Sequence, residues 1–258
     1  CRAMFTHRAL PYLRALADGT IVSRTLKIFG MGESSVEALL RERMNAMTNP
    51  TLAPYAKEGE MELRITAKAP TEAEARDLIA PVEEELRDLL GDVIYGADVK
   101  SLEEVAFALM EAQGLTFGTA ESCTGGMVAA KIINVPGASD VFDQGYITYS
   151  NKSKRKILDV SKATLKKYGA VSEQTAREMA LGGVLAADAD ACVAVTGLAG
   201  PDGGTEEKPV GLVYVSCCMK DEVIVEECHF NGTRQEIREH AAVTALDLLR
   251  RMIIRSRQ

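Results

Sequence analysis

Residues 191–211 read ACVAVTGLAGPDGGTEEKPVG, and this stretch decides the fold. Its first five residues form an uninterrupted apolar run, which is typical of a strand buried on both faces of a sheet. A loop rich in glycine and proline follows at the carboxyl end of that strand, where α/β proteins usually contact ligands. The loop lacks the G-K-[ST] of a P-loop and the G-x-G-x-x-G of a dinucleotide fold. A mobile surface turn is the alternative interpretation.

Helical and strand patterns alternate on both sides of the buried strand. The apolar spacing predicts helices over 101–113, 124–133, 151–167 (more than one), 173–187 and 233–255, and strands over 115–119, 145–149, 210–217 and 222–230. The short link at 219–222 makes the last two strands a hairpin. Helices interleaved with a mostly buried sheet predict the fold class α/β, here an α/β sandwich over residues 99–258.

The first part of the chain, residues 1–98, has patterns of a separate small α+β domain. Residues that favour strands predict a strand at 20–29, and strict alternation predicts one at 60–67. Helical spacing predicts helices near 36–47 and over 71–90. The two prolines in residues 49–54 indicate a turn. Residues 96–101 read as the joint between the domains.

The composition is that of an ordinary globular protein. The 258 residues are 47% hydrophobic and 26% charged with a net charge of −7, which excludes a disordered chain and a collagen-like repeat. Divided at residue 100, both parts are net acidic, so no broad nucleic-acid or membrane-surface footprint is expected. No apolar run approaches the ~20 residues of a membrane span. The six cysteines lack C-x-x-C spacing, and we expect a reducing, cytoplasmic location.

The strongest chemical signal is TAESCTGG at 119–126, between a predicted strand and helix. Gly125 and Gly126 let backbone N–H groups approach a ligand, and the following helix adds a positive N-terminal end. A serine there can attack a carbonyl while N–H groups stabilise the oxyanion. The alternative is that Ser122 or Thr124 merely caps the helix.

A serine nucleophile needs a base, and none of the three histidines adjoins a motif. Lysines crowd in YSNKSKRK (149–156), and like charges disfavour the ammonium form, so one of them can be partly neutral near pH 7. A solvated basic helix face is the alternative. Arg234, at the start of the last helix, can bind a phosphate or serve as a surface salt-bridge partner. No residues have metal-ligand spacing, so neither a metal nor another cofactor is expected.

These motifs, in this order, resemble the CinA family of competence/damage-inducible proteins. The matching stretches in residues 101–255 are TAESCTGG (119–126), GYITYSNKSK (145–154), KYGAVSEQTAREMA (167–180), VTGLAGPDGGTEEKPVG (195–211) and NGTRQEIR (231–238). IVSRTLKIFGMGES (21–34), TNPTLAPYAKEGEMELRITAKA (48–69) and GDVIYG (91–96) resemble the KH-type middle region of full-length members.

The resemblance implies hydrolysis of nicotinamide mononucleotide to nicotinate mononucleotide and ammonia, in pyridine nucleotide salvage. On the matching motifs, Ser122 is the nucleophile and Lys154, kept neutral by its basic neighbours, is the base. The expected substrate-binding residues are Tyr149, Thr196, Arg234, Gly125, Gly126 and Gly200. Backbone N–H groups around 123–126 are expected to stabilise the oxyanion, and Arg234 with the 197–204 loop to hold the phosphate.

Two activities of related proteins are not expected here. The resemblance does not include the molybdopterin-binding-like domain of full-length members, which is implicated in metal-dependent cleavage of ADP-ribose. The KH-type region has Gly30-Met-Gly-Glu instead of a G-x-x-G loop, so RNA binding is not inferred. A homodimer without membrane contact is expected. A non-catalytic nucleotide-sensing or partner-binding module, linked to competence or DNA damage, is the alternative function.

Overall fold

The computed structural model describes residues 2–16, 19–57 and 60–256 and divides the chain into two compact units, Cys1–Asp98 and Val99–Gln258. The first unit contains a four-stranded antiparallel sheet of order β2-β3-β1-β4. Its strands are β1 (Thr20–Ile28), β2 (Thr51–Lys57), β3 (Glu60–Ala69) and β4 (Ile94–Ala97). Its helices are α1 (Arg2–Met4), α2 (Leu10–Leu16), α3 (Glu33–Ala46) and α4 (Glu72–Leu90), with single turns at Phe5–Ala9 and Gly91–Val93.

The expectation of only two strands in this unit is wrong, because β2 and β4 also belong to the sheet. The two prolines of residues 49–54 predict a turn, yet Pro54 lies within β2, opposite Leu63 of β3. Since β2 is an edge strand, the missing N–H of Pro54 costs no ladder hydrogen bond on its open side. β4 overlaps the predicted domain joint, residues 96–101, only at its last two residues.

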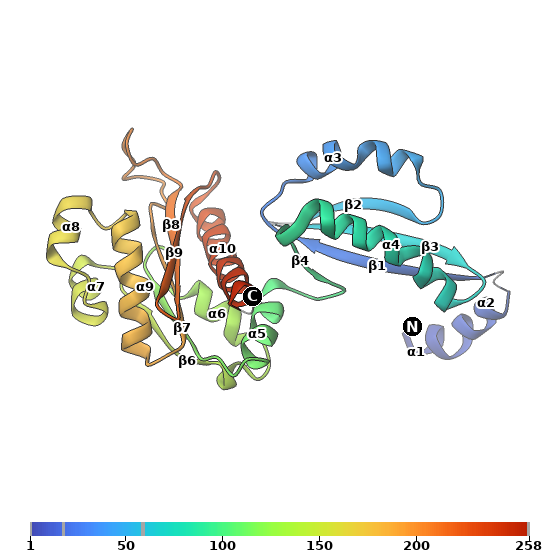
Figure 1. Cartoon of the computed structure of the whole chain (residues 1–258), viewed down its shortest axis with the longest axis horizontal. Coiled ribbons are helices and arrows are strands. Elements are labelled where there is room, and N and C mark those ends of the chain that lie inside the picture. Colours follow the sequence, from blue (N-terminus) through green and yellow to red (C-terminus); the bar gives the residue numbers. More distant parts are fainter. Residues whose placement is uncertain (1, 17–18, 58–59, 257–258) are drawn as a thin grey trace. The chain divides into compact units, whose positions relative to one another are not determined.

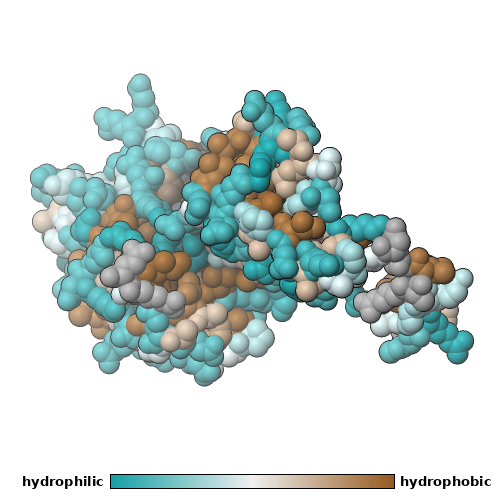
Figure 2. Space-filling view, turned by 45° about the vertical axis from the view of Figure 1, so that its right-hand side comes forward, coloured by the Kyte–Doolittle hydropathy of each residue, from teal (hydrophilic) through white to brown (hydrophobic). Residues whose placement is uncertain are grey.

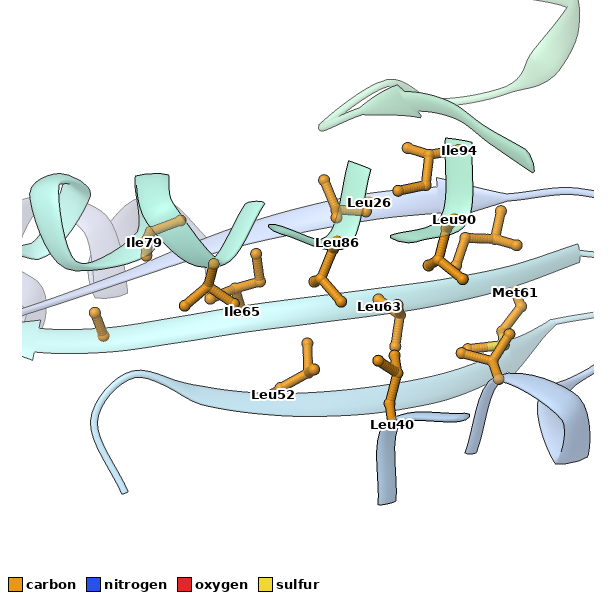
Figure 3. Close-up of a cluster of buried hydrophobic side chains, with 14 of the residues drawn as sticks. Leu26, Leu40, Leu52, Met61, Leu63, Ile65, Ile79, Leu86, Leu90 and Ile94 are labelled. Atoms are coloured by element: carbon orange, nitrogen blue, oxygen red, sulfur yellow. The ribbon is translucent and has the colours of Figure 1, made fainter. Parts of the chain in front are cut away.

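One face of this sheet is closed by an apolar core. Alternation in β3 buries Met61, Leu63 and Ile65, and α4 places Ile79 and Leu86 against them (Figure 3). Burying a side chain of this size contributes about 1.5–3 kcal/mol. A capping box between Thr71 and Glu74 fixes where α4 begins.

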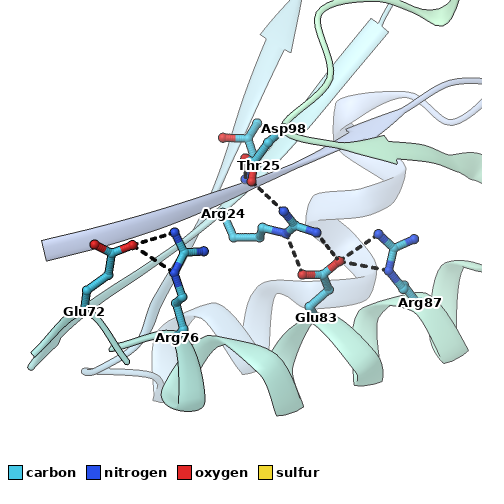
Figure 4. A network of polar contacts seen from close by, with 7 residues as sticks. All are labelled: Arg24, Thr25, Glu72, Arg76, Glu83, Arg87 and Asp98. Carbon is cyan, nitrogen blue, oxygen red and sulfur yellow. Dashed lines mark hydrogen bonds and ion pairs between the residues drawn. The ribbon is translucent and has the colours of Figure 1, made fainter. Parts of the chain in front are cut away.

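A polar network ties β1 to α4 and to the end of the unit (Figure 4). Arg24 Nε donates to Glu83 at 2.8 Å, and its Nη1 donates to Asp98 at 2.7 Å. Glu83 also accepts from Arg87, and Asp98 accepts from the backbone N–H of Thr25. Because these groups are partly exposed, the network orients the elements more than it stabilises them.

The second unit is a sheet of order β6-β5-β7-β8-β9 between two helical layers. Its strands are β5 (Phe117–Glu121), β6 (Phe142–Ile147), β7 (Ala191–Gly197), β8 (Leu212–Met219) and β9 (Glu222–His229). Its helices are α5 (Leu102–Glu111), α6 (Met127–Ile133), α7 (Asn151–Leu158), α8 (Lys162–Tyr168), α9 (Glu173–Ala187) and α10 (Arg234–Arg255), with a short turn at Ala138–Asp140. Figure 1 shows α7, α8 and α9 on one side of the sheet and α5, α6 and α10 on the other. The predicted α/β fold class is confirmed.

Strand direction decides where this unit can hold a site. β6, β5 and β7 pair in parallel, so their carboxyl ends meet at one edge, whereas β8 pairs antiparallel with both β7 and β9. The chain leaves β5 toward β6 and returns on the other side as β7, and α/β folds bind ligands at such a reversal of strand order. β7 is buried throughout except at Gly197, as the apolar run predicts.

The surface of the chain is mixed in character. On the face drawn in Figure 2, hydrophobic patches are interrupted by hydrophilic residues. None of the helices in the described part of the chain combines the length and apolar character that a membrane crossing needs.

Candidate active site

The loop 122–126 connects the carboxyl end of β5 to α6. Gly125 and Gly126 have φ values of +61° and +99°, in the left-handed region that favours glycine. The backbone N–H of Ser122 donates to Val195 of β7 at 2.9 Å, which anchors the start of the loop to the neighbouring strand. Ser122 is therefore held at the sheet edge where the three parallel strands end.

Lys154 reaches the same point from α7. A capping box between Ser150 and Ser153 fixes the start of this helix, and Lys154 lies one residue further on, on its buried side. Its Nζ lies 2.9 Å from Ser122 Oγ and donates to the carbonyl of Thr148 at 2.8 Å. The side chain is only 1% exposed. Two residues that are 32 positions apart thus form a buried Ser–Lys pair.

Burial is what sets the protonation of Lys154. Removal from water lowers the pKa of Lys154 to about 8, and the smaller electrostatic influence of Cys123 acts in the opposite direction. The expectation that basic neighbours keep Lys154 neutral is wrong, because Lys152, Arg155 and Lys156 are exposed on the outer side of α7. With a pKa of about 8, about a tenth of the amine is neutral and available as a base at pH 7, and about half at pH 8.

A pocket of about 280 Å³ opens over the Ser–Lys pair. It is lined by Ser122, Cys123, Tyr149, Lys154, Ala170, Val171, Asp202, Arg234 and residues 196–200. The connections after all three parallel strands contribute to it. Several of the lining side chains are small and aliphatic. Besides Lys154, the charged side chains are those of Asp202 and Arg234.

Four of the six expected binding residues line this pocket, and two do not. Arg234 donates to the Gly200 carbonyl at 2.6 Å and to the Tyr149 hydroxyl at 3.2 Å, so these three residues form one wall. Thr196 donates its hydroxyl to Ala170 at 2.7 Å and also lines the pocket. Gly125 and Gly126 shape the loop but are outside the lining.

The amino-terminal end of α6 is already occupied by protein. The Glu121 carboxylate accepts from the backbone N–H groups of Gly126, Val128 and Ala129. The expected role of this helix end in holding a ligand is therefore wrong, and the Gly126 N–H is committed elsewhere. The alternative that Ser122 or Thr124 caps α6 is also wrong, since the cap residue is Gly126, without a side-chain hydrogen bond.

Sequence reasoning missed three residues that hold the walls of the site. Glu121 is one of them, and the guanidinium of Arg238 donates to the carbonyls of Cys123 and Thr124. Lys208 donates to the carbonyls of Tyr168 and Val171, which ties the glycine-rich loop to the opposite wall. Arg238 follows Arg234 by four residues and so shares its helix face, but that spacing does not indicate which groups it bonds.

Other catalytic chemistries have less support at this site. His7, His229 and His240 are outside the pocket lining. Among the described residues, no group of three or more His, Cys, Asp and Glu side chains is arranged to hold a metal ion.

Comparison with known proteins finds two family models. The model described as CinA C-terminal domain matches residues 99–253, and the one described as Damage-inducible protein CinA KH domain matches residues 23–96. The chain is 48% identical to a competence-damage inducible protein of Clostridium beijerinckii over 98% of its length, and 49% identical to a CinA-like protein of Kosmotoga olearia over 97%. It spans only about 61–62% of the length of these relatives.

Solved structures resemble part of the chain. A competence/damage inducible protein from Agrobacterium tumefaciens is 41% identical with a TM-score of 0.57, covering 62% of this chain and 98% of that one. A CinA superfamily protein from Escherichia coli is 36% identical with a TM-score of 0.56, covering 59% of this chain and 91% of that one.

Proposed function

The chain belongs to the CinA family, and from that premise we propose that it hydrolyses the carboxamide of nicotinamide mononucleotide to nicotinate mononucleotide and ammonia. The names of the relatives state no reaction, so the proposal rests on the site. The observation that carries it is the buried contact of 2.9 Å between Lys154 Nζ and Ser122 Oγ. A serine paired with an amine whose pKa is about 8 is equipped for acyl transfer near neutral pH.

In the proposed mechanism, neutral Lys154 removes the hydroxyl proton of Ser122 as Oγ attacks the carboxamide carbon. A backbone N–H of the loop stabilises the oxyanion, and Cys123 is the candidate because it lines the pocket, whereas the Gly126 N–H is engaged by Glu121. The carbon–nitrogen bond breaks, and the proton held by Lys154 leaves with the amine as ammonia. Water then attacks the acyl-enzyme, again with Lys154 as base, and frees the carboxylate and Ser122.

The shape of the pocket is consistent with a flat ring carried by a phosphorylated sugar. Ala170, Val171 and Ala199 offer small apolar surfaces beside the Ser–Lys pair, where a pyridine ring would present its carboxamide. We place the phosphate at Arg234 and Tyr149, where a guanidinium and a phenol hydroxyl adjoin. A reducing, cytoplasmic setting belongs to the same proposal and is consistent with the five free cysteines among the described residues.

The test is release of ammonia from purified chain and nicotinamide mononucleotide. Ser122→Ala and Lys154→Ala should each lower kcat about 10³-fold or more, because losing either member of a nucleophile–base unit removes most of its catalysis. Lys152→Ala is the matched control, since it removes an exposed lysine from the same helix and should leave kcat unchanged.

Two results would contradict the proposal. Near wild-type turnover by Ser122→Ala would exclude the covalent route. Binding of the mononucleotide without any ammonia release by the wild-type chain would favour the non-catalytic sensing module.

A further inference from the structure

Glu121 is a buried acid whose hydrogen bonds run to the backbone of the next helix. The side chain is 1% exposed, and its carboxylate accepts from Gly126 at 2.8 Å, Val128 at 3.2 Å and Ala129 at 3.0 Å. An isolated buried carboxylate is costly, so three backbone donors and the positive end of α6 are what make this one tolerable. Glu121 thereby fixes the far end of the nucleophile loop.

Arg238 holds the same loop through its carbonyl groups. Its Nε donates to Cys123 and its Nη2 to Thr124, both at 2.9 Å, so one planar guanidinium spans two successive carbonyls. In a trans peptide the N–H points opposite to the preceding carbonyl. The contact therefore turns the N–H groups of Thr124 and Gly125 away from Arg238.

We propose that Glu121 and Arg238 are positioning residues that clamp loop 122–126 from its N–H side and its carbonyl side. The clamp presents Ser122 Oγ to Lys154 and fixes the course of the loop backbone beside the pocket. This inference rests on the proposed amidase function, because the loop matters only if Ser122 reacts.

The clamp acts through geometry and not through charge on the base. Glu121 and Arg238 bond to the loop backbone, whereas Lys154 Nζ bonds to Ser122 and to the Thr148 carbonyl. Loss of the clamp should therefore slow the chemical step without moving the pH at which Lys154 titrates. A small misplacement of a reacting group can cost about 10²-fold in rate.

The experiment measures kcat, KM and the pH profile for Glu121→Gln and Arg238→Lys with nicotinamide mononucleotide. Glu121→Gln keeps the shape of the side chain but replaces one carboxylate oxygen by an NH₂ group, which cannot accept from the backbone N–H groups. Arg238→Lys keeps the positive charge but lacks the planar guanidinium that spans two carbonyls. Each should lower kcat about 10–100-fold, with KM changed less than about threefold and the midpoint of the pH profile unmoved. Ser101→Ala, which removes the cap of α5, is the control for general destabilisation and should retain kcat.

A second readout separates this inference from the proposed function. A fluorophosphonate probe reports the reactivity of Ser122 without any amide substrate, and both variants should label about 10-fold or more slowly than wild type. If wild type labels but releases no ammonia, the amidase proposal fails while the labelling rates still decide the clamp.

The clamp proposal is overturned if Arg238→Lys has the kcat and the labelling rate of the wild type. It is also overturned if the midpoint of the pH profile shifts by one unit or more in either variant. Absence of both labelling and turnover in wild type overturns both proposals. If Glu121→Gln fails to fold, Arg238→Lys alone decides.

Discussion

At the residue scale, the pair of hydrogen bonds made by Lys154 explains how one amine can serve as a base. The Thr148 carbonyl is only an acceptor, so Nζ must donate to it in either protonation state. The contact with Ser122 can run in both directions. When the amine is neutral, its lone pair can face the Ser122 hydroxyl, and the bond is then aligned for proton removal.

The first prediction concerns the pH dependence of activity. Because the pKa of Lys154 is lowered to about 8 and the neutral amine is the active form, kcat/KM should rise with pH and level off above about pH 8. Below that midpoint it should fall about tenfold per pH unit. The measurement is ammonia release between pH 6 and pH 10. A profile that is flat from pH 6 to pH 9 contradicts Lys154 as the base.

The second prediction concerns stability. The folded-state pKa of Lys154 is lowered from 10.5 to about 8, so the unfolded chain binds more protons between these pH values. The contribution of Lys154 to the free energy of unfolding is therefore lowest below pH 8, and it increases as the pH rises toward 10.5. Relative to Lys154→Met, the wild type should gain on the order of 2 kcal/mol across that window. Urea unfolding of both proteins at pH 7, 9 and 10.5 measures the difference, and a constant difference contradicts it.

At the element scale, Gly182 determines how closely α7 approaches α9. A Cβ at this position would meet the backbone carbonyl of Leu158, the last residue of α7. Since backbone cannot rotate away as a flexible side chain can, α7 would have to shift. That helix carries Lys154, so packing between two helices controls the geometry of the Ser–Lys pair.

The third prediction follows from this contact. Gly182→Ala should destabilise the chain by about 1–3 kcal/mol by overpacking and should lower kcat at least about tenfold by moving Lys154. Leu185→Ala is the control, since Leu185 lies on the same helix and is 82% exposed. Thermal unfolding and ammonia release provide the two measurements. Unchanged kcat in Gly182→Ala would show that α7 accommodates the methyl group without moving the base.

Helices and strands whose apolar residues repeat regularly over their length could be predicted from the sequence. Elements that depend on pairing with a distant segment could not. The interval predicted for α9 is the observed one, since its apolar and small residues repeat at helical spacing. β2 was missed because only its pairing with β3 reveals that Pro54 sits in an edge strand. α6 starts at Met127 rather than near residue 124, because loop 122–126 is held by contacts distant in sequence.

The same distinction applies to the site. Long motifs pointed to Ser122 and Lys154, and the structure brings these residues together. Glu121 and Arg238 bond to backbone atoms, which every residue carries, so no pairing pattern in the sequence identifies them. The sequence predicts that charged neighbours lower the pKa of Lys154, because neighbours along the chain can be read from a sequence. The burial of a side chain, which is the actual cause, cannot.

At the scale of the whole molecule, each unit has a core of its own. The first is built on β1, β3 and α4, and the second includes buried residues of β5, β7 and α9. The Agrobacterium tumefaciens structure covers 62% of this chain, the same share as Val99–Gln258, and nearly all of its own length. A related chain of about that extent therefore folds on its own. The homodimer expected from the resemblance stays a prediction.

The last prediction is that the two units are separable in function. All residues of the pocket belong to Val99–Gln258, so this unit produced alone should fold and retain kcat within about threefold of the full chain. In the full chain, Leu63→Ala should cost the first unit about 2–5 kcal/mol, because Leu63 is fully buried in its core, while kcat stays unchanged. Urea unfolding and ammonia release test both proteins. A tenfold loss of turnover in either, with the second unit still folded, would show that the first unit supports the reaction.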